Sequence, residues 1–370
     1  FVSDEKMYKQ RLDLIVTGRT LFGDSPVKGQ ELDDHYFGNI DERVKAYMEE
    51  VDEELWKLGV FAKTEHKEVA PCQFELAPVF TSVNIANDQN QLTMEVLQRC
   101  ASHHGLVCLL HEKPFEGING SGKHDNWSIS TDDGENLLEP GDSPQDNIRF
   151  LTILAAIIKG VDEYQDLLRL SVASAGNDHR LGADEAPPAI ISIYLGEELT
   201  SILQAISEER EYVDHSDRRL ELGVSALPQI ARDSTDRNRT SPFAFTGNKF
   251  EFRMLGSNLN ISCPNTILNT IVAEELDQFA SELECYPKEM VNEALIGIIK
   301  RTLKEHNRII FSGNGYSEEW KEEAKRRGLL DLKTSADALV HYTDPKNLAL
   351  FSKHNVYQPH ELHARENILL

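Results

Sequence analysis

Hydrophobic residues recur at helical spacing in several stretches of the chain. Between residues 41 and 58 an apolar side chain returns every three or four positions, which predicts an amphipathic helix. Asn39 or Asp41 can cap its start, and Gly59 follows its end. Residues 145–173 predict a long and largely buried helix. The pattern predicts further helices over 84–104, 198–206, 265–280 and 288–311, and the last third of the chain is expected to be mostly helical.

Shorter stretches have the alternation or the uniform apolar character of strands. Strand-like segments are expected at 60–80, 106–110, 125–131, 189–195 and 243–255. Gly247-Asn248 is a turn signal that divides the last of them. Because strands and helices do not alternate regularly, we expect an α+β fold with an antiparallel sheet rather than a doubly wound fold.

Composition narrows the functional classes. The 370 residues can bury a large core in one large domain or two, and with 40% hydrophobic residues and no long apolar run we expect no membrane span. A net charge of −24 argues against a nucleic-acid partner but leaves room for a local basic pocket. The five cysteines are scattered and form no CxxC pair, which suits a reducing cytoplasm and no disulfide framework.

A glycine-rich loop is the most informative local feature. Residues 117–123 fit the phosphate-binding pattern G-x-x-x-x-G-K, but His124 replaces the hydroxyl residue that would hold magnesium. A phosphate-binding loop also opens a helix, whereas residues 125–131 have a strand pattern. The segment is therefore expected to be a strand, a loop and a second strand, with a histidine at the loop exit.

Two glutamates precede this loop in a strand-like block. Glu68 and Glu75 are seven positions apart, so an unbroken strand would place them on opposite faces, and a bend at Pro71-Cys72 could bring them to one side. Two solvated glutamates on a strand edge are the simpler alternative. With His124 the two carboxylates would form an oxygen-rich site that suits Mg²⁺ or Mn²⁺ better than structural zinc.

Cationic side chains gather in the second half of the chain. Alternation places Lys249, Glu251 and Arg253 on one strand face, either as a binding surface or as an exposed ladder of ion pairs. Residues 236–239 add two arginines, which commonly bind carboxylate and phosphate groups. The polar segment 179–188 ends in two prolines and could be a rigid surface turn.

Taken together and in this order, five motifs make the chain resemble glutamine synthetase, most closely its type III branch. The motifs are E-V-A-P-C-Q-F-E from residue 68, N-G-S-G-K-H from 119, H-R-L-G-A-D-E-A-P-P from 179, R-N-R from 237 and E-F-R from 251. Each motif alone is weak, but five in order are specific. The resemblance covers nearly the whole chain and implies that family's catalytic fold, a curved antiparallel sheet flanked by helices.

The resemblance also implies roles for individual residues. It assigns metal binding to Glu68, Glu75, His124 and Glu251, and glutamate binding to Asn119, Gly120, Arg180 and Arg253. It assigns ATP contacts to Asn126, Ser128 and Lys249, stabilisation of the transferring phosphate to Arg239, and ammonia capture in a mobile flap to Glu185. The implied cofactors are ATP and Mg²⁺ or Mn²⁺.

Two departures from the family pattern bear on these roles. Ala244 stands where the family has a second phosphate-binding arginine, so Lys249 or another cation is expected to take that part. The family pattern places its first metal motif and its small N-terminal domain before Phe1, and its far C-terminus beyond this sequence. We expect one catalytic domain over 1–370, with a peripheral segment (1–60), a core (61–282) and a helical part (283–370), that by itself forms glutamine poorly.

The implied reaction joins ammonia to the γ-carboxylate of glutamate, with ATP forming a γ-glutamyl phosphate first. The implied partners are glutamate, ammonia and further copies of the chain in a ring-like homo-oligomer, a dodecamer in the family, without nucleic acid or membrane. A related γ-glutamyl-amine ligase and a catalytically inactive scaffold of the same fold remain alternatives. Retention of the acidic residues and Arg239 argues against the scaffold, since buried charge without a ligand is destabilising.

Overall fold

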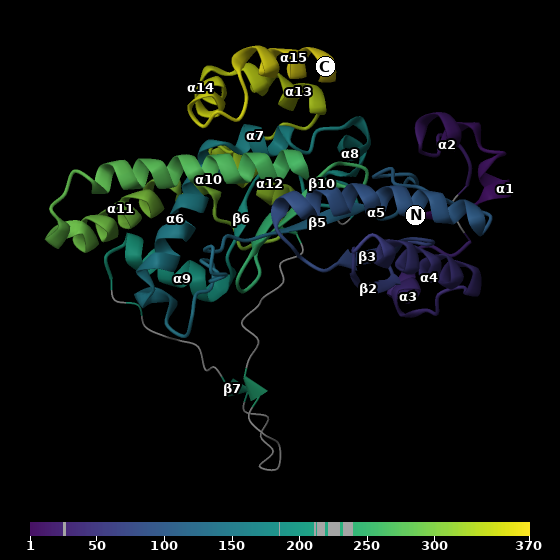
Figure 1. Ribbon diagram of the computed structural model, residues 1–370, viewed down its shortest axis with the longest axis horizontal. Coiled ribbons are helices and arrows are strands. Elements are labelled where there is room, and N and C mark those ends of the chain that lie inside the picture. The colour runs from purple at the N-terminus through teal and green to yellow at the C-terminus, as the bar shows by residue number, and fades with distance from the viewer. Residues whose placement is uncertain (25–26, 185, 211, 213–218, 221–229, 232–239) are drawn as a thin grey trace. The chain divides into compact units, whose positions relative to one another are not determined.

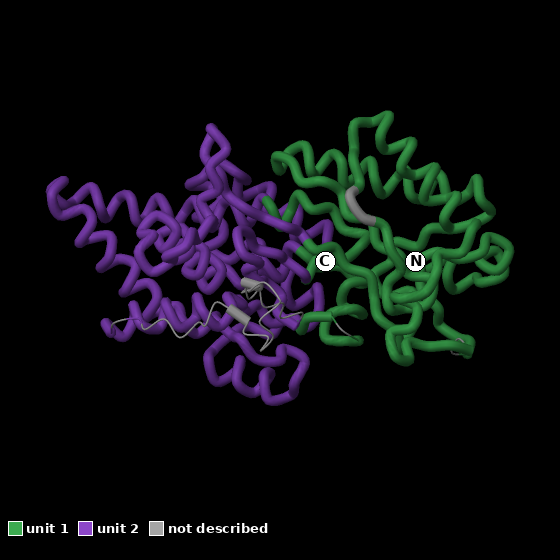
Figure 2. Tube along the Cα trace, turned by 90° about the horizontal axis from the view of Figure 1, so that it is seen from below, with its two compact units in different colours: residues 1–124, 172–188, 254–265 green, residues 125–171, 189–253, 266–370 purple. Residues whose placement is uncertain are grey.

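A computed structural model describes residues 1–24, 27–184, 186–210, 212, 219–220, 230–231 and 240–370 (Figure 1). The predicted site residues Glu185 and Arg239 lie outside these ranges. The chain divides into two compact units made of interleaved segments (Figure 2). Unit 1 comprises 1–124, 172–188 and 254–265, and unit 2 comprises 125–171, 189–253 and 266–370. The expected partition at residues 60 and 282 stays a prediction.

Two helices build the main core of unit 1. The predicted helix over 41–58 is α4 (Glu42–Lys57), and the Asp41 side chain caps it by accepting a hydrogen bond from the backbone N–H of Arg43. Its buried face packs with α5 (Val83–His103) in one apolar cluster. The remaining elements of this unit are β1 (Val2–Asp4), α1 (Glu5–Tyr8), α2 (Leu12–Thr17), α3 (Asp34–Phe37), β2 (Ala62–Lys67), β3 (Phe74–Pro78), β4 (Leu106–Cys108) and α8 (Ala175–Arg180).

A four-stranded sheet runs in the order β5-β10-β9-β6, with β5 (Gly122–Trp127), β6 (Ile193–Tyr194), β9 (Phe243–Phe245) and β10 (Phe250–Gly256). The hairpin predicted around Gly247-Asn248 is confirmed, because β9 and β10 pair antiparallel across it. The α+β class is confirmed as well. One pair departs from the expected antiparallel sheet, since β6 pairs parallel with β9. The long connection between these two strands, which includes α9 (Gly196–Ser207), allows that direction.

Alternation along β10 has the predicted consequence. Phe250 and Phe252 are fully buried, and Phe243 of β9 stacks on Phe250 with ring centroids 4.6 Å apart. The intervening residues Glu251 and Arg253 therefore share the other face of the strand. The sheet thus presents a carboxylate and a guanidinium side by side.

The long helix expected over 145–173 is two helices, α6 (Ile148–Glu163) and α7 (Gln165–Leu170), broken at Tyr164. The Gln165 side chain donates a hydrogen bond to the carbonyl oxygen of Asp162, which supports the break. Of the strand expected at 189–195, only β6 forms. The other elements are β7 (Arg219–Leu220), β8 (Ile230–Ala231), α10 (Ser262–Leu283), α11 (Val291–His306), α12 (Glu318–Arg326), α13 (Ser335–Leu339), α14 (Pro345–Lys353) and α15 (Pro359–Leu369).

Helices cover most of the C-terminal third, as expected, and α13, α14 and α15 form a small group at its end (Figure 1). Within the described residues, no helix combines the length and the apolar character needed to cross a lipid bilayer.

Candidate functional site

The two glutamates of the strand-like block lie on a β-hairpin. β2 and β3 pair antiparallel, and the chain reverses between them through Cys72, whose φ is +58°. The backbone N–H of Glu68 donates to the carbonyl oxygen of Gln73 at 2.9 Å, which closes the turn. The bend expected at Pro71-Cys72 therefore exists, and it explains how residues seven apart can share one side of the hairpin.

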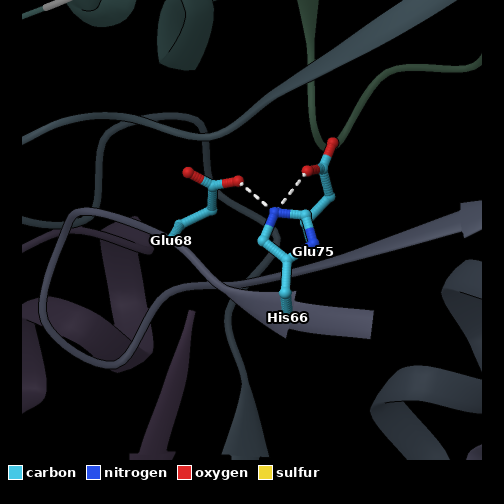
Figure 3. Close-up of side chains that lie close together, drawn as sticks. All are labelled: His66, Glu68 and Glu75. Carbon is cyan, nitrogen blue, oxygen red and sulfur yellow. Dashed lines mark hydrogen bonds and ion pairs between the residues drawn. The ribbon is translucent and has the colours of Figure 1, made fainter. Parts of the chain in front are cut away.

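His66 brings these glutamates together. Its Nε2 lies 2.9 Å from Oε1 of Glu68 and 3.0 Å from Oε2 of Glu75 (Figure 3). Both distances are hydrogen-bond lengths, and Tyr36 packs edge-on against the imidazole with ring centroids 5.5 Å apart. One nitrogen thus bridges two carboxylates that would otherwise repel each other.

The electrostatics of this cluster favour a positive charge. Burial raises the pKa of Glu75, the carboxylate of Glu68 raises it further, and His124 and His66 act against both. Glu75 and His124, two of the predicted metal ligands, therefore interact within unit 1. Glu251 lies in unit 2, so its membership in the set stays a prediction.

A second acidic pair connects β2 with α4. Glu65 of β2 faces Asp52 of α4, and one buried oxygen of each side chain has no hydrogen-bond donor. Burial, followed by the charge of Asp52, raises the pKa of Glu65 to about 7. The pair is thus arranged to share a proton near neutral pH.

The glycine loop holds the predicted glutamate-binding positions. Asn119 exchanges two hydrogen bonds with Gln30: its N–H donates to Oε1 of Gln30 at 2.7 Å, and its Oδ1 accepts from Nε2 at 3.0 Å. The carbonyl oxygen of Gly120 accepts from the buried Gln73 side chain at 3.0 Å. The loop is therefore tied both to the peripheral segment and to the acidic hairpin, and it leads into strand β5 rather than a helix, as predicted.

Arg180 is buried at the end of α8, in the same unit as the glycine loop. Its Nη1 donates to the carbonyl oxygens of Leu255 at 3.2 Å and Met254 at 3.4 Å. A Cβ at Gly122 would collide with this guanidinium, so a side chain at that position would have to displace Arg180. Arg180 thus lies directly against the glycine loop.

Two further predicted residues form an ion pair on β10. Arg253 donates through Nε and Nη2 to Oε2 of Glu251, at 2.9 and 2.6 Å. Arg253 is 6% exposed, so the alternative of a fully exposed charge ladder is wrong for this residue. Ala244 lies directly across from Glu251 in the sheet and is buried. A long cationic side chain would not fit at that position without repacking.

The predicted nucleotide-side residues lie in unit 2. Ser128 donates to Oδ1 of Asn136 at 2.8 Å and to the carbonyl oxygen of Asn248 at 3.3 Å. Asn126 belongs to β5, and Lys249 is half-buried directly before β10. Their roles towards ATP stay predictions.

The donors of the hairpin cluster suit a hard divalent cation. His66, Glu68 and Glu75 each offer one ligand atom, and these atoms lie within 4.8 Å of one another. A second cluster with the same residue types, Asp166, His341 and Asp344, fits less well because the ammonium of Lys346 already lies 2.9 Å from Asp166. The hairpin is the better candidate metal centre.

The sequence interpretation missed His66, and it missed Lys113, a buried lysine whose ammonium donates to the carbonyl oxygen of Ile118 in the glycine loop. Alternation along β2 places His66 on the same face as Glu68, so the period of the strand contained the signal. The burial of Lys113 had no such signal, because a lysine in a polar stretch is normally solvated.

Comparison with known proteins identifies the family of this chain. The family model described as glutamine synthetase, catalytic domain, matches residues 18–192, and the glutamine synthetase C-terminal domain matches 294–370. Type-3 glutamine synthetase of Dictyostelium discoideum is 51% identical over the whole chain. This chain belongs to the glutamine synthetase family, in its type III branch. That family acts as glutamate–ammonia ligase and uses ATP and divalent metals.

The chain covers only part of the length of its relatives. Glutamine synthetase of Butyrivibrio fibrisolvens is 50% identical, again over the whole chain. The chain spans 50% of the Dictyostelium protein and 53% of the Butyrivibrio protein, so it covers about half the length of these relatives. A structure of Plasmodium falciparum glutamine synthetase superposes on 72% of this chain, and the match covers 44% of the Plasmodium chain. The TM-score is 0.50 and the sequence identity is 13%. That likeness concerns the fold.

Proposed function

We propose that this chain takes part in the ATP-dependent ligation of ammonia to the γ-carboxylate of L-glutamate, with glutamine, ADP and phosphate as products. The observation that carries the proposal is the convergence of Glu68 and Glu75 on one imidazole nitrogen, because such a carboxylate pair invites a divalent cation. Membership in the glutamine synthetase family supports the same reaction.

The acid substrate is held by the glycine loop and arginines in this proposal. Asn119 and Gly120 offer amide and backbone groups, and Arg180 lies buried beside them in the same unit. Arg253 supplies a second guanidinium, whose partner in this structure is Glu251. Guanidinium groups bind carboxylates through paired hydrogen bonds, which would orient glutamate.

The metal ligands we propose are Glu68, Glu75, His124 and Glu251, with His66 as a further imidazole at the hairpin. When bound, Mg²⁺ or Mn²⁺ would supply positive charge to the phosphates of ATP. Asn126, Ser128 and Lys249 are the proposed ATP contacts, and Arg239 is proposed to stabilise the transferring phosphate. The two glutamates hold their geometry through the hairpin turn, so they need little rearrangement to bind a cation.

The chemistry proceeds in two balanced steps. An oxygen of the γ-carboxylate attacks the γ-phosphorus of ATP, and the bond to ADP breaks. The lone pair of ammonia then attacks the acyl carbon, the C–O bond to phosphate breaks, and one proton passes from the nitrogen to the released phosphate or to water. Glu185 is proposed to accept the proton of ammonium. The acyl phosphate would hydrolyse in water, so this step needs a site closed to solvent.

Replacement of Arg253 by alanine tests the substrate assignment. Arg253→Ala should raise the KM for glutamate about tenfold to a hundredfold and leave the KM for ATP nearly unchanged, because a lost carboxylate contact costs about 1.5–3 kcal/mol. Arg301→Ala is the matched control, since Arg301 pairs with Glu282 on the surface of the same unit. Equal changes for both substrates would contradict the assignment, and a wild type that prefers an alkylamine to ammonia would favour a γ-glutamyl-amine ligase.

Self-association into a ring-like homo-oligomer, a dodecamer, is the partner proposal. Large apolar side chains stand exposed in the peripheral segment, among them Leu12, Val16, Phe22 and Phe37. Such surfaces commonly become buried against another protein surface. Light scattering after gel filtration measures the mass, and a monomer at micromolar concentration would contradict the proposal. We place the reaction in the cytoplasm, which suits the five free cysteines.

A further inference from the structure

Lys113 has an unusual environment for a lysine. It follows β4, and its side chain is 1% exposed. Its ammonium donates to the carbonyl oxygen of Ile118 and to Oδ2 of Asp184, the latter at 2.6 Å. A buried ammonium is costly unless it is paired, so these two acceptors offset the cost of its burial. One side chain therefore joins two segments that are 66 residues apart (184 − 118).

The first segment is the glycine loop. Ile118 directly precedes Asn119 and Gly120, the proposed glutamate-binding positions. The loop is fastened at its other end as well, since the N–H of Ser121 donates to the carbonyl oxygen of Glu112 at 2.7 Å. Residues 112 and 113 thus hold both ends of the short stretch that would contact glutamate.

The second segment is the turn that follows α8. The N–H of Ala183 donates to the carbonyl oxygen of Arg180 at 3.0 Å, and the N–H of Gly182 donates to that of Pro187 at 3.0 Å. Asp184 is the residue of this turn that reaches Lys113, and its side chain is 39% exposed. The turn therefore has a charged anchor a few residues from the buried Arg180.

We propose that Lys113 is a positioning residue that couples the glycine loop to the turn that follows α8, the helix that ends at Arg180. The groups that would bind the acid substrate thereby keep a fixed distance from one another. The inference rests on the proposed function, because only that proposal assigns glutamate binding to Asn119 and Arg180. The coupling between the two segments depends only on the contacts of Lys113, so it can be measured without an assay of enzyme activity. All of its members lie in unit 1.

The two ends of the ion pair offer variants of different severity. Asp184→Asn leaves a buried ammonium without a counter-charge, whereas Lys113→Met leaves an aspartate that water can reach. Asp184→Glu keeps the carboxylate on a half-exposed side chain. Lys159→Met is the matched control, because Lys159 pairs with the buried Glu275 in unit 2. Circular dichroism shows which variants remain folded.

Hydrogen–deuterium exchange reads the coupling in the purified protein. The substitution Asp184→Asn lies in the turn, but its effect is expected in the glycine loop. We expect the exchange rate of the peptide covering 116–123 to rise about tenfold, which corresponds to a loss of about 1.4 kcal/mol in the free energy of local opening. Lys113→Met should raise exchange in both 116–123 and 180–188, and Lys159→Met in neither. Faster exchange confined to the turn in Asp184→Asn would overturn the proposal.

Ligand affinity separates positioning from general destabilisation. In calorimetric titrations, Asp184→Asn should weaken L-glutamate binding about tenfold and ATP binding less than about twofold, and Asp184→Glu should recover most of the loss. Equal losses for both ligands, or no recovery with glutamate at 184, would overturn the positioning role. A wild type that binds no glutamate would instead refute the proposed function, and the exchange experiment would still decide the coupling.

Discussion

The acidic hairpin of unit 1 differs from a pair of buried aspartates in unit 2. In unit 2, the carboxylate of Asp162 lies 2.8 Å from nitrogen atoms of Arg308 and His306. The carboxylate of Asp166 accepts hydrogen bonds from Lys346 and Asn347, each at 2.9 Å. In unit 1, Glu68 and Glu75 share a single histidine. Glu65 faces the carboxyl group of Asp52, and the charge of Glu49 acts on it in the same direction.

The pKa values reflect this difference. Burial alone would raise the pKa of Glu274 in unit 2, but hydrogen bonds from Lys353, Gln278 and His354 outweigh burial and lower it to about 2. In unit 1, burial and Asp52 raise the pKa of Glu65 to about 7. Glu275 of unit 2 is an exception: Lys159 is its partner, yet burial raises its pKa to about 7, as in Glu65.

The comparison separates structural charges from functional ones. An acid that a fold uses for stability has its cation built in, as Asp162 and Asp166 do. Carboxylates that face each other destabilise the fold until a proton or a metal ion arrives. The hairpin of unit 1 has that second arrangement, which is why we place the metal centre there.

The largest expected effect comes from breaking a structural pair. Asp166→Ala should lower the free energy of unfolding by about 3–5 kcal/mol, because Asn347 and Lys346 lose a buried partner. Glu68→Gln should change it by less than about 1 kcal/mol, since relief of repulsion offsets the lost contact with His66. Urea unfolding at pH 7.5 measures the free energy of unfolding of both variants. Equal losses of stability in the two variants would contradict the distinction between the hairpin acids of unit 1 and the paired acids of unit 2.

A smaller effect is expected from Glu65→Gln, and it depends on pH. The folded pKa of Glu65, about 7, lies above the unfolded value of 4.5, so wild-type stability falls as pH rises from about 4.5 to 7. Glutamine cannot ionise, so the variant should be more stable than wild type by about 2–3 kcal/mol at pH 8 and nearly equal to it at pH 4.5. Thermal unfolding at several pH values measures this.

Glu53→Gln controls for the pH experiment. Glu53 lies on the exposed face of the same helix as Asp52, and its replacement should leave the pH dependence of stability unchanged. A Glu65→Gln variant with the wild-type pH profile would mean that the Glu65–Asp52 pair does not hold a proton near neutral pH.

The smallest effect is metal stabilisation. At free Mn²⁺ ten times above the Kd, the chain should gain about 1.4 kcal/mol of stability. Glu75→Gln should lose that gain, and Asp344→Asn, in the other histidine–carboxylate cluster, should keep it. Thermal shifts with and without a chelator measure the difference. Loss of the gain in Asp344→Asn alone would move the metal centre to unit 2.

Much of the fold could be predicted because local patterns were strong. Three predicted features are present in the structure as expected. They are the helix over 41–58, the strand with the buried Phe250 and Phe252, and the hairpin turn at Gly247-Asn248. The break at Tyr164 and the parallel direction of β6 could not be predicted, because both depend on partners distant in the chain. The hydrogen bond from the N–H of Leu330 to Oε1 of Gln165 and the pairing of β6 with β9 are both tertiary contacts.

The candidate site divides in the same way. The sequence by itself determined the family, through five ordered motifs, and which residue types the site contains, because chemistry is encoded in side chains. It also indicated that a bend at Pro71-Cys72 was needed for Glu68 and Glu75 to meet. Only the tertiary structure decided that His66 is the residue between them and that Lys113 is buried between two loops. Proximity across many residues depends on packing, and the spacing of residues along a chain does not contain it.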